Sequence, residues 1–357
     1  MFDLKSIKTR ATENPKDYIL KNEALETAIQ MAIWLGKPLL LTGAPGTGKT
    51  QLAYKVADML ANGKNKNADR AAPFLDRPFV FNTKTTSTAT DLFYYYDAVR
   101  HFQKKYIDEI DKPTEVSTAH PFIKLNALGK AIVQAYGKDA VANSAELQDL
   151  QKLEDFDSIK SQPISSVVLI DEIDKAPRDF PNDLLNEIEN LEFFINELMN
   201  KKISRPTTNA QIVVIMTSNF EKNLPDAFLR RCLFYHIPSP TPAELINIVV
   251  TRLERHLKEL YHEKDNDRLN KISEKLTNNI SVAINEFQEI KSLVKDKEPA
   301  TAELLDWIKA LEQQDFFSDE IDFKAMKPEK KKILHSVSSA LAKTDADLER
   351  LKKRYAE

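Results

Sequence analysis

The 357 residues (40.7 kDa) suggest two domains, or one large domain with an appendage, and the hydrophobic (42%) and charged (29%) fractions are those of a soluble globular protein. The formal net charge of −3 gives no overall attraction to nucleic acid or anionic membrane, and the longest apolar runs, residues 167–170 and 212–216, are too short to cross a bilayer. A single cysteine, Cys232, excludes an internal disulfide, and the first residues lack the apolar core of a secretory signal, so we expect a cytoplasmic protein.

The start of the chain predicts an arm followed by a helix. Residues 1–17 are polar, which predicts a loosely held N-terminal arm. We expect an α/β domain over residues 18–239 and a helical domain over residues 240–357. Apolar residues recur at helical spacing over residues 22–34. This helix could cover an adenine ring or pack in the core, and the two roles are compatible.

A strand, a glycine-rich loop and a helix follow one another over residues 39–60. The loop carries the pattern G-x-x-x-x-G-K-[ST], in which glycines let successive backbone N–H groups turn toward one anion. The N-terminus of the following helix adds partial positive charge. The chain has only seven glycines and three of them lie in this loop, so we interpret it as a phosphate loop rather than an ordinary turn. The predicted nucleotide-binding residues are Gly43, Ala44, Pro45, Gly46, Thr47, Gly48, Lys49, Thr50 and Gln51.

The next segments carry strands and aromatic residues. A second strand is predicted over residues 78–82, and Thr90 with Asp91 is predicted to cap a helix. The residues of that helix include Leu92, Phe93, Tyr94, Tyr95, Tyr96 and Phe102. An exposed aromatic set could grip a partner polypeptide, whereas aromatic stripes more often belong to a core. Residues 103–163 are mostly helical in composition, so we interpret them as an insertion between strands.

The second decisive stretch places two carboxylates after an apolar run. Val167–Ile170 predicts a buried central strand of a parallel sheet, and Asp171 and Glu172 emerge at its C-terminal edge, where open α/β sheets bind ligands. Asp171 is predicted to hold Mg²⁺ through its water, and the Thr50 hydroxyl to ligate the ion. Lys49 would reach the β- and γ-phosphates. Glu172 would polarise the water that attacks the γ-phosphate.

Further polar residues follow the next two predicted strands. Residues 211–216 predict another central strand, and Asn219 just beyond it could orient the attacking water or serve as a turn residue. Arg230 and Arg231 precede a strand predicted over residues 233–237. Paired arginines there could be surface charge, or could reach a neighbouring subunit's γ-phosphate in the manner of an arginine finger.

The rest of the chain predicts helices. Proline density at residues 238–242 marks a domain boundary. No strand pattern appears beyond it, and helices are predicted over residues 243–260, 269–293, 300–313 and 331–342. Acidic residues interleave with the basic runs 330–332 and 352–354, which favours solvated helix faces over nucleic-acid contacts.

Together these residues resemble the AAA+ ATPases, and within them the MoxR family. The phosphate loop is Gly43–Thr50, the acidic strand end is Val167–Glu172, and Asn219 occupies the position called sensor 1. Residues 171–190, DEIDKAPRDFPNDLLNEIEN, are similar to the MoxR helix after the acidic strand, and the likeness runs from about residue 18 to about residue 343. The resemblance implies an AAA+ core with a five-stranded parallel sheet, a hairpin inserted in the second helix at Phe193–Leu198, and a C-terminal all-α lid domain.

The resemblance also implies an assembly and a partner. It implies a hexameric ring that hydrolyses ATP with Mg²⁺ and works with a protein carrying a von Willebrand factor A domain, remodelling it or inserting a metal. Many relatives open the third lid helix with an arginine, sensor 2. Here the nearby cations are Lys295 and Lys297, so sensor 2 stays unassigned. Arg230 and Arg231 both fit the arginine finger, and Arg231, the one nearer the strand, is favoured.

The sequence therefore predicts an ATPase that assembles with itself and acts on a partner protein. Its catalysis would consist of positioning and electrostatics, with a neighbour's arginine stabilising the transferring phosphoryl group. The alternative is a nucleotide-gated binding switch with slow hydrolysis. A nucleic-acid remodelling ATPase is a weaker alternative, because no basic groove with interleaved aromatics is visible. No base-reading motif is present, so ATP rather than GTP follows from the resemblance alone.

Overall fold

The computed structural model describes residues 15, 18, 23–63, 72–111, 118–219, 223–261 and 266–356. The chain divides into two compact units. The first contains Leu20–Gly43 and Lys49–Ile237, and the second contains Pro238–Glu357 together with Asp17–Ile19 and Ala44–Gly48. The N-terminal arm predicted for residues 1–17 lies outside the described residues, apart from Pro15.

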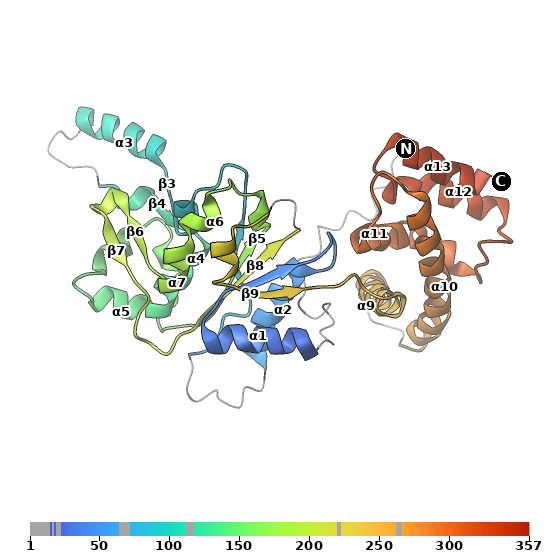
Figure 1. Ribbon diagram of the computed structural model, residues 1–357, viewed down its shortest axis with the longest axis horizontal. Coiled ribbons are helices and arrows are strands. Elements are labelled where there is room, and N and C mark those ends of the chain that lie inside the picture. Colours follow the sequence, from blue (N-terminus) through green and yellow to red (C-terminus); the bar gives the residue numbers. More distant parts are fainter. Residues whose placement is uncertain are drawn as a thin grey trace. The chain divides into compact units, whose positions relative to one another are not determined.

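The first unit is built on a five-stranded parallel sheet (Figure 1). Its strands are β1 (Leu39–Thr42), β2 (Phe79–Asn82), β5 (Ser166–Asp171), β8 (Ile212–Ser218) and β9 (Leu233–His236). Their order across the sheet is β2-β5-β8-β1-β9, and all neighbours run parallel. Strands β1, β5 and β8 are almost entirely buried, which explains their long apolar runs. The predicted five-stranded parallel sheet is confirmed.

The helices of the first unit are α1 (Glu23–Leu35), α2 (Lys49–Asn62), α3 (Ala98–Asp111), α4 (Ala127–Tyr136), α5 (Lys138–Asn143), α6 (Phe180–Asp183), α7 (Leu185–Asn190) and α8 (Asp226–Leu229). Helix α2 contacts β5 and β8, and α1 contacts β1 and β9. Helix α1 buries Leu25, Ile29 and Ala32, which recur at the helical spacing seen in the sequence.

The aromatic segment after β2 differs from its prediction. Instead of one helix, Leu92 ends a 3₁₀ turn, Tyr94–Tyr96 form strand β3, and helix α3 begins only at Ala98. Strand β3 pairs in antiparallel fashion with β4 (Ile123–Leu125). Consecutive aromatic residues suit a pleated surface with one buried face: Tyr94 is 2% exposed, whereas Tyr95 is 54% exposed.

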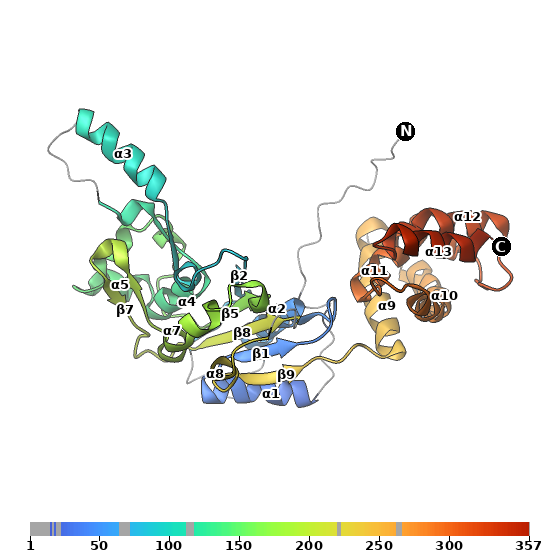
Figure 2. The same cartoon turned by 45° about the horizontal axis from the view of Figure 1, so that its top comes forward.

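Membership of the core is confirmed for the first three of these residues, and contact of the exposed ones with a partner stays a prediction. Leu92, Phe93 and Tyr94 belong to the core of the first unit, whereas Phe102 is exposed on α3. Helix α3 projects from the rest of the first unit (Figure 2). At its base, His101 stacks on Phe122 with ring centroids 4.6 Å apart.

The predicted insertion at residues 103–163 is only partly an insertion. Helix α4 contacts β2, β5 and β8, so it belongs to the layer that covers the sheet. The remainder consists of the far part of α3, strand β4, helix α5 and 3₁₀ turns at His120–Phe122, Gln148–Lys152 and Phe156–Ser158. Composition alone did not separate the covering helix from the segments around it.

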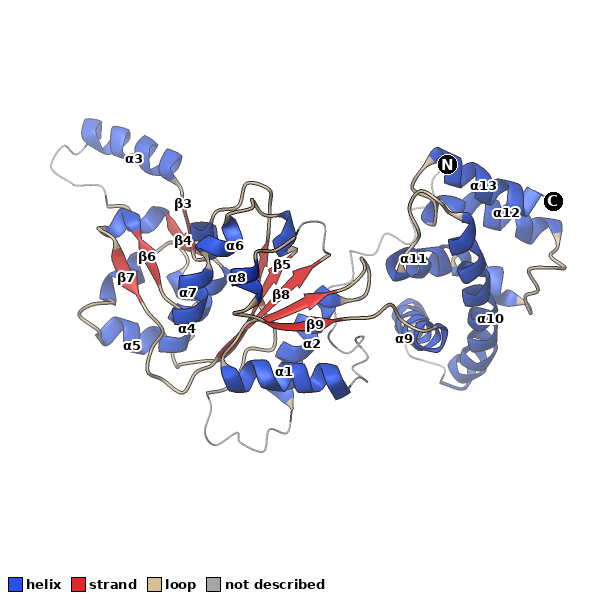
Figure 3. Cartoon of the chain, viewed as in Figure 1, coloured by secondary structure: helices blue, strands red, loops and turns tan. Residues whose placement is uncertain are grey.

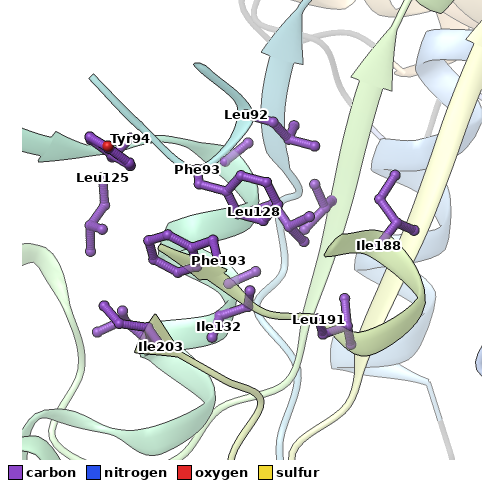
Figure 4. Packing of buried hydrophobic residues seen from close by; sticks show 14 of the residues in the cluster. Leu92, Phe93, Tyr94, Leu125, Leu128, Ile132, Ile188, Leu191, Phe193 and Ile203 are labelled. Carbon is purple, nitrogen blue, oxygen red and sulfur yellow. The ribbon is translucent and has the colours of Figure 1, made fainter. Parts of the chain in front are cut away.

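A β-hairpin follows α7, where the resemblance implies one at Phe193–Leu198, and it extends further, to Ile203. Strands β6 (Phe193–Ile195) and β7 (Lys201–Ile203) pair in antiparallel fashion, and Leu191 ends α7 with a left-handed backbone (φ +51°). Phe193 stacks on Phe93, with ring centroids 5.0 Å apart. Figure 4 shows this contact among the buried residues that join the hairpin to the segment after β2.

The second unit is helical (Figure 3). Its helices are α9 (Pro242–Tyr261), α10 (Asn266–Leu293), α11 (Thr301–Glu312), α12 (Pro328–Val337) and α13 (Asp345–Ala356). Its core includes Phe287, Trp307 and Phe316, so the unit has apolar packing of its own. Helix α13 was not predicted, because its sequence is densely charged and has few apolar residues.

The charges of α13 are partly used inside the second unit rather than solvated. Arg354 donates from Nε to Oε1 of Glu286 at 2.7 Å and also contacts Glu289. The hydroxyl of Tyr355 donates to the same Oε1 atom at 3.0 Å. Asp347 accepts hydrogen bonds from the backbone N–H of Lys295 and of the residue after it. These contacts tie α13 to α10 and to the loop that follows it.

Candidate active site

The loop after β1 needs glycine at three positions. Gly43, Gly46 and Gly48 have φ angles of +149°, +77° and +85°, which residues with a side chain rarely adopt. The hydroxyl of Thr47 donates to the carbonyl of Ala44 at 2.8 Å. This backbone conformation explains why three of the seven glycines of the sequence cluster here.

Lys49, the first residue of α2, lies beside the carboxylates at the sheet edge. It is 7% exposed, and its ammonium donates to the carbonyl of Gly43 at 2.8 Å. Burial lowers the pKa of Lys49, and the negative charges of Asp171, Asp174 and Glu172 act in the opposite direction. A buried cation with anionic neighbours is suited to bind a polyphosphate chain.

The end of the phosphate loop meets the end of β5. The hydroxyl of Thr50 donates to the carboxylate of Asp171, at 3.0 Å from Oδ1 and 3.2 Å from Oδ2. Mg²⁺ prefers oxygen ligands and keeps several waters, so a hydroxyl next to a carboxylate fits the ion when phosphates supply the other ligands. Within the described part of the chain, no three His, Cys, Asp or Glu side chains gather to hold a metal unaided.

Glu172 has an unusual backbone and several polar neighbours. Its φ angle of +56° lies in the left-handed region, which is uncommon for a residue other than glycine and which clusters at functional sites. Its carboxylate accepts from Nζ of Lys175 at 2.5 Å and from Nδ2 of Asn219 at 3.4 Å. The backbone N–H of Asn219 donates to Asp174 at 3.0 Å. The ends of β5 and β8 are therefore joined by side chains.

The arginines predicted as fingers differ in their contacts. Both are exposed. Arg231 donates to Oε2 of Glu189 at 3.2 Å and to the carbonyl of Ala227 at 3.1 Å. The backbone N–H of Arg230 donates to the carbonyl of Asp226 at 3.1 Å, whereas its side chain forms no hydrogen bond or ion pair recorded with a described residue.

Two further predictions concern Gln51 in the phosphate-loop helix and the missing sensor 2 arginine. Gln51 lies in the first turn of α2, and its Oε1 atom is buried with no hydrogen bond recorded to a described residue. Lys295 and Lys297, the cations near the missing sensor 2, are exposed in the loop between α10 and α11. The first turn of α11 carries no arginine, so the departure seen in the sequence persists in the structure.

The structure adds three polar residues that sequence reasoning missed. These are Thr217, Asp174 and Lys175, all of which contact Asp171, Glu172 or Asn219. A signal for Thr217 was present: residues two apart on a strand point to the same side, so Thr217 shares the side of Asn219. No comparable periodicity marks Asp174 and Lys175, because they lie in a 3₁₀ turn after β5.

A parallel sheet with a glycine-rich phosphate loop after one strand and two carboxylates after another defines a P-loop nucleotide-binding protein. The chain matches the AAA model, "ATPase family associated with various cellular activities", over residues 39–239, which is more than half of its length. The chain therefore belongs to the AAA family of ATPases. No curated protein sequence matches it. Among the helices described, none is both long and apolar enough to cross a membrane.

Proposed function

We propose that this AAA-family ATPase hydrolyses Mg-ATP in a ring of identical subunits, hexameric as in the MoxR family, and thereby remodels or activates a partner protein with a von Willebrand factor A domain. The observation that carries the proposal is the meeting of two polar groups from distant parts of the sequence. The Thr50 hydroxyl at the end of the phosphate loop lies 3.0 Å from the Asp171 carboxylate, and Glu172 follows directly.

The phosphate loop and its neighbours supply binding. Lys49 and the loop amides would hold the β- and γ-phosphates, and Thr50 with Asp171 would hold Mg²⁺. Bound Mg²⁺ supplies charge neutralisation on the phosphate oxygens. Because the Thr50 hydroxyl donates its proton to Asp171, its lone pairs remain available as a ligand. This arrangement explains why a hydroxyl residue is needed directly after the lysine.

Glu172 and Asn219 supply the hydrolytic step. A water oxygen bonds to the γ-phosphorus, the bond from that phosphorus to the bridging oxygen breaks, and ADP leaves. Glu172 accepts the water's proton at Oε1, since Oε2 is engaged by Lys175 at 2.5 Å. The Asn219 amide, 3.4 Å from Oε1, is close enough to orient the same water. An arginine from the neighbouring subunit would stabilise the charge on the transferring phosphoryl group.

Two variants test these assignments. Glu172→Gln keeps the size of the side chain but removes its basicity, so ATP binding should stay near wild type while turnover falls about 10²- to 10⁴-fold. Lys49→Ala should weaken binding itself, measured with a fluorescent ATP analogue. Glu154→Gln is the control, because Glu154 forms an exposed ion pair with Arg100 away from the site. Wild-type hydrolysis by the Glu172 variant would refute the assignment.

The ring and the partner need separate measurements. Sedimentation velocity of Glu172→Gln with ATP and Mg²⁺ should show a ring-sized species that dissociates when nucleotide is removed. Immobilised Glu172→Gln with ATP should retain a von Willebrand factor A domain protein, whereas Lys49→Ala should not. A species that remains monomeric at every nucleotide concentration would contradict the ring proposal.

A nucleotide-gated switch with slow hydrolysis is the second candidate. It is favoured by the ion pair of Lys175 with Glu172, which engages one oxygen of the proposed base. A switch should show ATP-dependent association with its partner and no change in turnover when the partner is added. Stimulation of turnover by the partner would favour the remodelling ATPase.

A further inference from the structure

A buried threonine joins the two carboxylates of the candidate site. Thr217, the next-to-last residue of β8, is fully buried. Its hydroxyl donates to Oδ1 of Asp171 at 2.6 Å and accepts the backbone N–H of Glu172 at 2.8 Å. A hydroxyl has one proton and a backbone N–H can only donate, so the direction of both hydrogen bonds is fixed. The Thr217 side chain thus forms one hydrogen bond with the carboxylate of Asp171 and another with the backbone of Glu172.

A second link runs in the opposite direction. Asp174, which follows β5 in a 3₁₀ turn, is 2% exposed and accepts the backbone N–H of Asn219 at 3.0 Å. The end of β8 therefore holds the end of β5 through Thr217, and the segment after β5 holds the end of β8 through Asp174. This pair of links fixes the spacing between the carboxylates and Asn219.

We propose that Thr217 is a positioning residue for ATP hydrolysis, acting through Asp171 and Glu172. The proposal rests on the proposed function of the same site. Asp171 also accepts from Thr50, and the shorter bond from Thr217 fixes which way its carboxylate turns toward that hydroxyl. Glu172 keeps its left-handed backbone while its N–H has an acceptor in Thr217. Without that acceptor, the partly buried N–H of Glu172 would lose its partner and the backbone would relax, carrying the Glu172 carboxylate away from Asn219.

Thr217→Val tests the hydroxyl because valine has nearly the same shape as threonine and forms neither hydrogen bond. Thr217→Ser keeps the hydroxyl and is the conservative variant. The control is Thr208→Val, four residues before the start of β8. Like Thr217, Thr208 donates one hydrogen bond through its hydroxyl and accepts one backbone N–H: it donates to the carbonyl of Ala135 at 2.9 Å and accepts from Ala210 at 3.4 Å.

The expected result separates positioning from packing. Thr217→Val should lower kcat about 10- to 100-fold, the range expected for losing hydrogen bonds to a charged group. Its affinity for a fluorescent ATP analogue in EDTA should stay near wild type, since Lys49 and the loop amides are untouched. The increase in affinity that Mg²⁺ gives the wild type should be reduced. Thr217→Ser should recover most of the rate, and Thr208→Val should hydrolyse ATP at the wild-type rate.

Other outcomes overturn the proposal in distinguishable ways. Wild-type kcat and Mg²⁺ response in Thr217→Val, alongside an inactive Glu172→Gln, would end the positioning role and leave the proposed function standing. Equal loss in Thr208→Val, or loss of EDTA-measured affinity in Thr217→Val, would assign Thr217 to general stability. Wild-type activity in Glu172→Gln would end both proposals. If Thr217→Val does not fold, Thr217→Ala, which leaves space for a water, takes its place with the same criteria.

Discussion

The two adjacent arginines before β9 should differ in their effect on ATP turnover when each is replaced by alanine. Arg231 pairs with Glu189 at 3.2 Å, with side chains that are 46% and 64% exposed. An exposed pair of this kind contributes about 0–1 kcal/mol to the free energy of unfolding, so we expect Arg231→Ala to change stability and turnover little. The side chain of Arg230 is exposed and forms no recorded hydrogen bond or ion pair with a described residue, which leaves its guanidinium available to the next subunit of the proposed ring.

The magnitude expected for Arg230 is much larger. An arginine finger accelerates phosphoryl transfer about 10³- to 10⁵-fold, which corresponds to about 4–7 kcal/mol of activation free energy. Arg230→Ala should therefore lower kcat by about 10³-fold or more while leaving nucleotide affinity and the unfolding midpoint near wild type. The measurement is steady-state hydrolysis at saturating ATP, at a protein concentration where sedimentation shows the proposed ring.

A mixing experiment tests whether Arg230 acts between subunits. Arg230→Ala and Glu172→Gln should each be inactive alone. In randomly mixed rings, a site is complete where an Arg230→Ala subunit supplies Glu172 and its neighbour supplies Arg230. An equal mixture should therefore recover about a quarter of wild-type activity, because each head-to-tail interface draws one residue from each subunit. Wild-type turnover by Arg230→Ala, or a large loss in Arg231→Ala instead, would refute the reasoning.

Three further predictions concern stability and reactivity. Glu286→Ala should lower the free energy of unfolding of the helical unit by about 3–5 kcal/mol in urea titrations, because Glu286 is 6% exposed and its loss leaves Arg354 and Tyr355 without their shared partner. Burial raises the pKa of Cys232 to about 12, so its thiol should react slowly with iodoacetamide at pH 8 in the native protein and quickly in denaturant; equal rates would contradict the burial. Burial lowers the pKa of His120, so the unfolded chain binds more protons than the folded one as the pH falls below about 6.5. The free energy of unfolding should therefore rise with pH up to about pH 6.5. His120→Gln should reduce the slope of that rise.

The sequence alone predicted the parts of the site that depend on short-range pattern. The phosphate loop and the acidic strand end each consist of contiguous residues whose spacing follows from backbone geometry. Their meeting follows from the rule that the carboxyl ends of parallel strands lie at one edge of the sheet. The contact of Thr50 with Asp171 is what these rules predict for residues 121 positions apart.

Other features depend on contacts that no local pattern records. The aromatic residues at 92–96 fit a helix or a strand equally well by periodicity, and the choice is made by packing of Phe93 on Phe193 about a hundred residues away. The sequence does not predict helix α13, because some of the contacts that hold it to the helical unit are ion pairs between charged residues, such as Arg354 with Glu286. The sequence favours Arg231 as the arginine finger, whereas the ion pair of Arg231 with Glu189 leads us to propose Arg230, and the sequence does not place Glu189 beside either arginine.

The reversal of backbone handedness at Glu172 solves a geometric problem for neighbouring acids. On a strand that simply continued, consecutive side chains would project to opposite faces of the sheet and could not share one task. Because β5 stops at Asp171 and the next residue turns left-handed, one carboxylate reaches α2 and the other reaches the tip of β8. A glycine at position 172 could keep that turn but would lose the acid, and a valine could keep neither.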